Sequence, residues 1–221
     1  MAGSDHEESN RVRVRRAPER GLYDRDTIDE ILDVGMICHV GYQADHGPVV
    51  LPTLYGRSGD VIYIHGSPAA GMFRNSTRPD VCLTVTHTDG IVLARSLMHH
   101  SMNYRSVTVL GKMEIVSDPD EIIAGLKAIT ENVIAGRWDE ARQPNEDELR
   151  QTLVAKIPLG EASAKVRTGP PGDGEEDLSL DIWAGVVPIA TAPGEPIPAP
   201  NLSASLVNRV PMSVAGLIRG K

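Results

Sequence analysis

Short apolar runs separated by turn residues dominate the chain from about residue 36 to residue 115. Runs rich in Val, Ile and Thr occupy residues 36–42, 49–55, 61–65, 81–88, 91–95 and 105–115. The breaks between them hold Asp, Gly and Pro, and Asp89-Gly90 fits a tight hairpin turn. Two later runs, 153–167 and 183–190, have the same character. Six or more short strands at this spacing predict a mainly β fold, a β-barrel with added helices, rather than an alternating βαβ sheet.

Apolar residues recur at helical spacing in only a few places. The first helix is predicted to begin with Asp26 as its N-cap and to stop at Gly35. The clearest helix follows Asp118, which is a good N-cap and is followed by Pro119 at the first helical position. A shorter helix is predicted to start at Asn145.

The two ends of the chain differ from the middle. Residues 1–20 are charged and lack an apolar period, so we expect a disordered N-terminal arm there, with the basic run 11–16 as a solvated part of it. Residues 191–221 hold four prolines in their first ten positions and are expected to form a tail, which could lie over a partner subunit. Residues 21–190 are therefore expected to be the folded domain.

Charge and composition narrow the class of protein. The net charge of −8 provides no global field that would attract DNA, RNA or anionic lipid. The N-terminus has no apolar segment of the signal-peptide type, and no run approaches the length of a membrane span. Cys38 and Cys82 lie in apolar runs, as buried thiols of a reducing compartment would. We expect a cytoplasmic protein.

The common nucleotide-binding motifs are missing from the chain. No GxGxxG sequence opens a helix after a first strand, and no GxxxxGK[ST] loop is present. A dinucleotide site of the Rossmann type and a P-loop site are therefore not expected.

Three polar clusters are candidates for ligand binding. Residues 63–67 read Tyr-Ile-His-Gly-Ser and could approach a phosphate at the end of a strand, or could be a plain turn. Residues 99–106 form the densest polar run, in which Arg105 could pair with a phosphate; the alternative is a surface hairpin. Trp183 stands next to two small residues and could wall a planar ring or anchor a core. Because adjacent strand residues point to opposite faces, His99 and His100 do not predict a metal site.

In combination, these clusters resemble a known family. Residues 48–53, 62–67, 99–107, 163–171 and 183–188 occur in the order seen in FMN-binding split-barrel proteins. Those proteins are relatives of pyridoxamine 5′-phosphate oxidase, and the resemblance is to the flavin-nucleotide-binding or nitroimidazole-resistance-like subgroup. It runs from about residue 20 to residue 190 and implies a six-stranded split barrel, a homodimer, and FMN at the subunit interface.

The resemblance also implies a set of cofactor-binding residues. The strand that would lie along the flavin ring contributes Val50, Leu51, Pro52 and Thr53. The turn near the phosphate and ribityl chain contributes Tyr63, His65, Gly66 and Ser67. The polar run beside the ring contributes Asn103, Tyr104, Arg105 and Ser106. Trp183 would flank the cofactor from the second subunit. The chain departs from the family at Ala70 and Gly71, where a Ser and a basic residue are frequent, so Arg74 or Arg105 would have to supply the charge.

The implied function is an FMN-dependent oxidoreductase. It would take a hydride from a reduced nicotinamide and reduce a small electron-poor acceptor such as a nitroaromatic or a quinone, and pyridoxamine phosphate oxidation itself is not expected. His65, His99 or Tyr104 could donate a proton, but no catalytic residue is assigned. One alternative is the same fold with FAD, a deazaflavin or haem, with His99 or His100 as the iron ligand. Another is a flavin-binding protein without enzymatic activity.

Overall fold

The computed structural model describes residues 10–74 and 79–219. These residues form one antiparallel sheet of ten strands with helices packed on it. The strands are β1 (Gly21–Leu22), β2 (Ile37–Ala44), β3 (Gly47–Ser58), β4 (Val61–Gly66), β5 (Asp80–Leu93), β6 (Ser101–Lys112), β7 (Glu114–Ile115), β8 (Leu153–Pro158), β9 (Glu161–Arg167) and β10 (Gly185–Pro188). The α-helices are α1 (Arg25–Val34), α2 (Gly71–Arg74), α3 (Pro119–Val133), α4 (Arg137–Glu140), α5 (Glu146–Arg150) and α6 (Met212–Arg219), and η1 (Pro18–Arg20), η2 (Leu97–His99) and η3 (Glu175–Asp177) are short 3-10 helices.

The predicted mainly β architecture with added helices is confirmed. Strands follow one another in the order β1-β9-β6-β5-β2-β3-β4-β8-β7, and β10 pairs with β5. Strand β3 joins two parts of the sheet, because its first eight residues pair with β2 and its last four residues pair with β4. The sheet curls around a core of aliphatic side chains and one buried tyrosine, Tyr55. This is the split-barrel arrangement.

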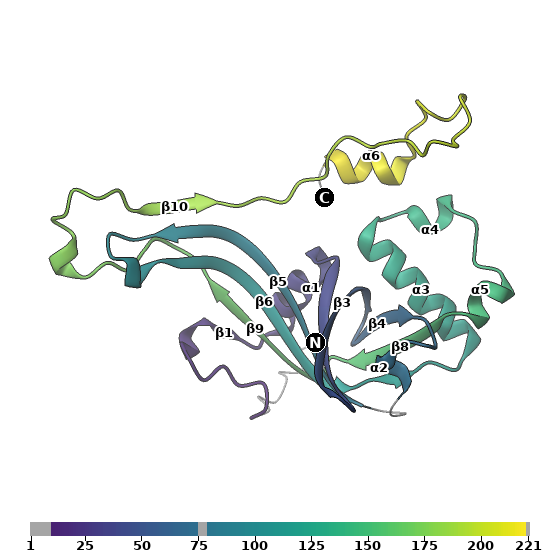
Figure 1. Ribbon diagram of the computed structural model, residues 1–221, viewed down its shortest axis with the longest axis horizontal. Coiled ribbons are helices and arrows are strands. Elements are labelled where there is room, and N and C mark those ends of the chain that lie inside the picture. Colours follow the sequence, from purple (N-terminus) through teal and green to yellow (C-terminus); the bar gives the residue numbers. More distant parts are fainter. Residues whose placement is uncertain (1–9, 75–78, 220–221) are drawn as a thin grey trace, which may run out of the picture.

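Helix α1 closes one end of the core, and α3 covers the outside of β3 and β4 (Figure 1). Helix α3 packs closely on β3 because β3 has a glycine, Gly56, where the two elements cross. A Cβ placed on Gly56 would lie 2.2 Å from the carbonyl carbon of Ala128 in α3. Asn132, one turn farther along α3, donates hydrogen bonds to the carbonyl oxygens of Gly35 at 2.7 Å and Tyr55 at 3.0 Å.

Two local predictions from the sequence are wrong. Asp24, rather than Asp26, is the N-cap of α1, and it accepts a hydrogen bond from the Thr27 N–H. Asp89-Gly90 is not a hairpin turn, since β5 runs through it with a register shift between Thr88 and Gly90. The glycine serves a close approach instead: a Cβ on Gly90 would lie 2.9 Å from Val186 of β10.

The described segments before β1 and after β10 lie outside the sheet. Residues 1–9 of the expected N-terminal arm are outside the described residues, whereas Val12, farther along it, is buried. After β10, residues 189–211 have no regular secondary structure and lead to α6 (Figure 1). Among the described residues, no helix is both long and apolar enough to span a bilayer.

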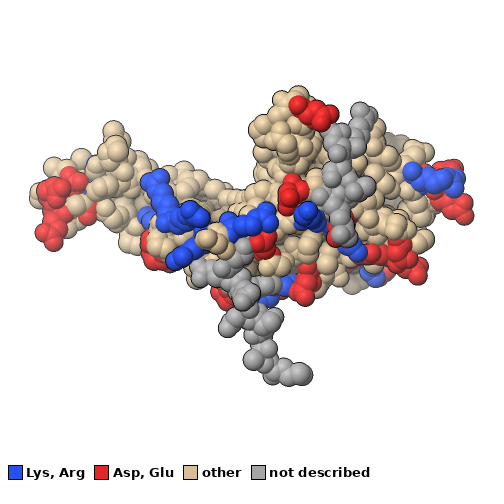
Figure 2. All heavy atoms as spheres, turned by 90° about the horizontal axis from the view of Figure 1, so that it is seen from below, with Lys and Arg blue, Asp and Glu red and all other residues tan. Residues whose placement is uncertain are grey.

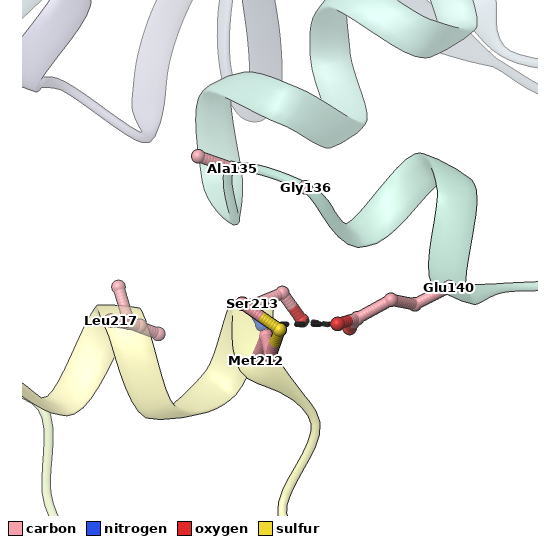
Figure 3. A pocket seen from close by; sticks show the side chains of 7 residues that line it. Ala135, Gly136, Glu140, Met212, Ser213 and Leu217 are labelled. Atoms are coloured by element: carbon pink, nitrogen blue, oxygen red, sulfur yellow. Dashed lines mark hydrogen bonds between the residues drawn. The ribbon is translucent and has the colours of Figure 1, made fainter.

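Helix α6 contacts the remainder of the described chain mainly at α4, over a small area. The side chain of Glu140 accepts hydrogen bonds from the N–H of Ser213, at 3.2 Å, and from its hydroxyl (Figure 3). This bond lowers the pKa of Glu140. A cavity of about 480 Å³ lies between α6 and the α3–α4 turn, next to Leu217 (Figure 3).

Candidate cofactor-binding site

The predicted ring-facing strand is an exposed edge. Residues 47–54 of β3 pair with β2 on one side, and β4 begins to pair only at Tyr55. The Ala44–Gly47 pair closes the two-residue turn between β2 and β3, and from there every second residue of β3 forms hydrogen bonds to β2. The backbone groups of Pro48, Val50 and Pro52, which lie between these residues, therefore point away from β2 to the unpaired side. Proline has no N–H, so Val50 supplies the one backbone donor between Pro48 and Pro52. Its side chain is 64% exposed, and Leu51 and Thr53 are its neighbours on this strand.

The predicted phosphate turn lies at the end of β4. Ser67 holds it, because its Oγ accepts the Ala69 N–H at 3.2 Å and its carbonyl accepts the Ala70 N–H at 2.9 Å. Gly66 is required there, since a Cβ would lie 2.8 Å from the ring of Phe73. The side chain of Arg74 is outside the described residues.

His65, in the same turn, has an unusual environment. Its Nδ1 is shielded from solvent and has no hydrogen-bond partner. Burial lowers the pKa of the imidazole, which favours the neutral ring. A neutral imidazole with an uncommitted nitrogen can act as a metal or haem ligand.

Tyr63 is committed to helix packing. It is 8% exposed, and its hydroxyl donates to Glu121 of α3 at 3.1 Å. Lys156 donates to the same carboxylate at 2.7 and 2.9 Å. The structure therefore places the Tyr63 hydroxyl in a polar network at the α3 end, apart from the turn at Ser67.

The polar run on β6 is held by partners within the chain. Arg105 donates to both carboxylate oxygens of Asp89, at 3.0 and 2.9 Å, and this bond raises the pKa of Arg105. Asn103 donates to the carbonyl of Gly169 at 3.1 Å, and Ser106 donates to the carbonyl of Lys165 at 3.3 Å. Tyr104 pairs across the sheet with Thr88 and Arg167. Sequence reasoning missed the role of Asp89, because it was read as part of a turn.

Trp183 lies far from the β3 edge within one chain. It is 67% exposed and precedes Gly185, which pairs with Leu93 at the far end of β5. The middle of the sheet, at Leu83, is reached ten residues earlier along β5, so about 30 Å of strand lies between the two positions. One chain therefore places the predicted tryptophan far along the sheet from the β3 edge.

His99 and His100, the histidines first considered as iron ligands, lie near the turn between β5 and β6. A ring nitrogen of His99 lies within 4.8 Å of carboxylate oxygens of Asp173 and Asp177. Asp173 is already bound by Arg95, at 2.8 Å. Nδ1 of His100 lies 3.1 Å from the carbonyl oxygen of Ser96.

Comparisons with known proteins place the chain in a family. A model of the pyridoxamine 5′-phosphate oxidase family matches residues 24–166. The structure is similar to that of the flavocytochrome Anf3 from Azotobacter vinelandii, at 38% identity over 94% of this chain and 96% of that one, with a TM-score of 0.88. It is also similar to an FAD- and haem-binding protein from Mycobacterium smegmatis, at 35% identity over 90% of this chain and 97% of that one, with a TM-score of 0.85.

A third structure is more distant. A candidate 5-nitroimidazole antibiotic resistance protein from Bacteroides thetaiotaomicron is 26% identical over 66% of this chain and 86% of that one, with a TM-score of 0.55. Among curated proteins no match was found. The match over residues 24–166 and the two long alignments show that this chain belongs to the pyridoxamine 5′-phosphate oxidase family.

Proposed function

We propose that this chain is a redox protein that binds a flavin, as FAD rather than FMN, together with haem. The observation that carries the proposal is the similarity to Anf3, a flavocytochrome, and to a protein that binds FAD and haem, each over at least 90% of this chain. The family model ends at residue 166, whereas these two alignments extend well beyond it. The flavin would accept electrons singly or in pairs, and haem would pass them singly.

The residues beside β4 fit a haem. Buried Ile64 points into the core, so alternation along β4 places His65 on the opposite face, and there its Nδ1 has no partner. On the corresponding outer face of β2 and β3, Ile37, Val50 and Leu54 are between 38% and 64% exposed. An apolar surface bordered by an uncommitted histidine suits a large, flat, mostly apolar ligand. His65 replaces His99 and His100 as the proposed iron ligand.

A flavin would be held by the residues that the sequence singled out. The free N–H of Val50 and the carbonyls on either side of it offer a donor and acceptors to a ring edge. Ser67 and Arg105 offer a hydroxyl and a guanidinium to a phosphate. Arg105 can donate to a phosphate only if its hydrogen bonds to Asp89 break, or if the guanidinium donates to Asp89 and the phosphate at the same time.

We also propose that the working unit is a homodimer. Trp183 and Val50 are both exposed and lie too far apart in one chain to contact the same ligand. A second copy would bring Trp183 of one chain to the β3 edge of the other.

A second candidate function is the reduction of a nitroaromatic or quinone by a reduced nicotinamide, with a flavin as the only cofactor. Its support is the similarity to the 5-nitroimidazole resistance protein. Consumption of NADPH with a nitroimidazole by the flavin-loaded protein would favour it.

The proposal is tested by the spectrum of the purified protein. We expect a Soret band, flavin absorbance, and FAD in the extract after denaturation. His65→Ala is expected to lose or shift the Soret band while retaining FAD, and His99→Ala, the matched control, is expected to leave both unchanged. A protein that takes up flavin but never haem would contradict the haem assignment, and one that takes up neither would contradict the whole proposal.

A further inference from the structure

A row of positive charge lies along one edge of this acidic protein. The segment before η1 places arginines at 11, 13, 15 and 16, and buried Val12 fixes its orientation. The N–H of Val14 donates to the hydroxyl of Tyr23 at 2.9 Å, which ties the segment to the residues after β1. Arg15 and Arg16 are both exposed. This stretch of the expected arm is therefore attached to the sheet.

Strand β9 extends the row. Nζ of Lys165 donates to the carbonyl oxygen of Arg16 at 3.1 Å, and Lys165 pairs with Gly21, next to Arg20. We call Arg15, Arg16, Arg20 and Lys165 the basic strip. In the described part of the chain, Arg15, Arg16 and Lys165 form no ion pair with a carboxylate. Figure 2, which views the molecule from below, shows a row of Lys and Arg side chains on this face with Asp and Glu side chains beside it.

The basic strip borders the candidate cofactor site. Lys165 pairs across the sheet with Ser106, and the hydroxyl of Ser106 donates to the Lys165 carbonyl at 3.3 Å. Ser106, whose side chain lies on the opposite face of β6 from that of Arg105, belongs to the polar run that the family resemblance places beside the flavin ring. One strand spacing, about 4.8 Å, therefore separates the strip from the strand that carries this residue.

We propose that the basic strip is the docking surface of an acidic electron-carrier protein that reduces the bound flavin. The inference rests on the proposed function. Arg15 and Arg16 are exposed, Lys165 is half-buried, and Arg20 lies 3.7 Å from Glu19, so the strip keeps a net positive charge on a chain of net charge −8. Such a local field attracts a compact anionic surface and speeds its encounter. Docking beside Ser106 would bring the carrier close to the redox group, which electron transfer requires.

The electron balance needs a one-electron donor, such as a ferredoxin with an iron–sulfur cluster. Two reduced carriers bind in turn and each gives one electron to the bound flavin. Two protons from solvent complete its two-electron reduction, and two oxidised carriers leave.

Other anionic partners fit the strip less well. A nucleic acid strand would extend past these few residues onto surface of the opposite sign, and no aromatic side chain alternates with Arg15 and Arg16 to stack on bases. Anionic vesicles and single-stranded oligonucleotides therefore serve as comparison probes.

The test is the rate at which reduced [2Fe–2S] ferredoxin reduces the flavin in stopped flow. We expect a second-order rate constant that falls with ionic strength and falls about tenfold or more in the double variant Arg15→Glu/Arg16→Glu. Reduction by dithionite and the bound flavin content are expected to stay unchanged. The control, Arg142→Glu/Arg150→Glu, changes the net charge equally on exposed residues near α5 and is expected to keep the wild-type rate.

Each outcome is decisive. A reduction rate that depends neither on ionic strength nor on the residues of the basic strip would overturn the docking proposal. If the protein still contains flavin and dithionite still reduces it, the proposed function stands. Tight, strip-dependent binding to oligonucleotides or to anionic vesicles, without faster reduction by ferredoxin, would also overturn it. Absence of flavin would instead count against the proposed function.

Discussion

Arg105 on β6 holds Asp89 on β5 through two hydrogen bonds, of 3.0 and 2.9 Å, at the register shift in β5. The backbone carbonyl of Asp89 also accepts the Ile189 N–H at 3.1 Å, just after β10. The guanidinium proposed to meet a flavin phosphate is thus already neutralised by the Asp89 carboxylate, and the backbone of the same residue contacts the start of the C-terminal segment.

This pair predicts opposite effects on flavin affinity. Arg105→Ala is expected to weaken flavin binding by one to two decades, because a charge-assisted contact is worth about 1.5–3 kcal/mol. Asp89→Asn is expected to tighten binding, because it removes the competing charge and keeps the shape. Fluorescence titration of the apo-protein with FAD measures both. Asp33→Asn, which takes a carboxylate from Arg57 elsewhere, is the control; equal affinities in all variants would place the phosphate elsewhere.

The crossing of α3 over β3 predicts a sensitive glycine. Gly56→Ala is expected to lower the free energy of unfolding by roughly 1–3 kcal/mol or more, because the added methyl meets the α3 backbone, which cannot move aside locally. Gly160→Ala has open space around its Cβ and is expected to be nearly neutral. Urea unfolding of both variants checks this, and a neutral Gly56→Ala would mean that α3 packs less closely.

His65 predicts a pH dependence of stability in the ligand-free protein. Burial lowers its pKa in the folded state below the value of about 6.5 in the unfolded chain. The unfolded state therefore binds more protons just below pH 6.5, and stability falls as the pH drops through that value, then levels off below the folded-state pKa. His65→Gln is expected to lose this component, whereas His99→Gln, at an exposed site, is expected to retain it. Urea midpoints from pH 4.5 to 8 supply the measurement.

The contact of α6 predicts a separately mobile C-terminal helix. Ser213 and Glu140 make the polar contact between α6 and the rest of the protein (Figure 3). Ser213→Ala and Glu140→Gln are each expected to speed hydrogen exchange of residues 212–219 several-fold while the exchange of β5 and β6 stays unchanged. Exposed Ser205→Ala is the control. Unchanged exchange in the first two variants would show that apolar contacts such as Leu217 hold the helix.

Local sequence signals predicted the elements well where the cause was local. As expected, Asp118 caps α3 with Pro119 in its first turn, and Asn145 begins the shorter helix α5, where it forms a capping box with Glu148. Gly90 was misread because its cause is distant: β10, almost a hundred residues later, approaches it closely. The partner of Arg105 was missed for the same reason, since the register shift that presents Asp89 depends on strand pairing.

The set of cofactor-binding residues stays a prediction. Residues 50–53 lie on an exposed strand edge, and Ser67 lies in the turn after β4. Tyr63 belongs to the packing of α3, and exposed Trp183 stands far along β5. Sequence spacing carries no information on which side chains one chain can bring together and which require a second chain. The unpartnered nitrogen of His65 likewise becomes visible only once neighbouring strands are in place.

The central claim is that one chain of this family carries both a flavin and haem. Protein expressed with haem and riboflavin supplied, then denatured and extracted, is expected to release FAD and protoheme in about equal amounts. An extract with FMN alone would contradict the claim and indicate a flavin-only oxidoreductase. An extract with neither cofactor, after attempted reconstitution, would contradict both the flavin and the haem assignment.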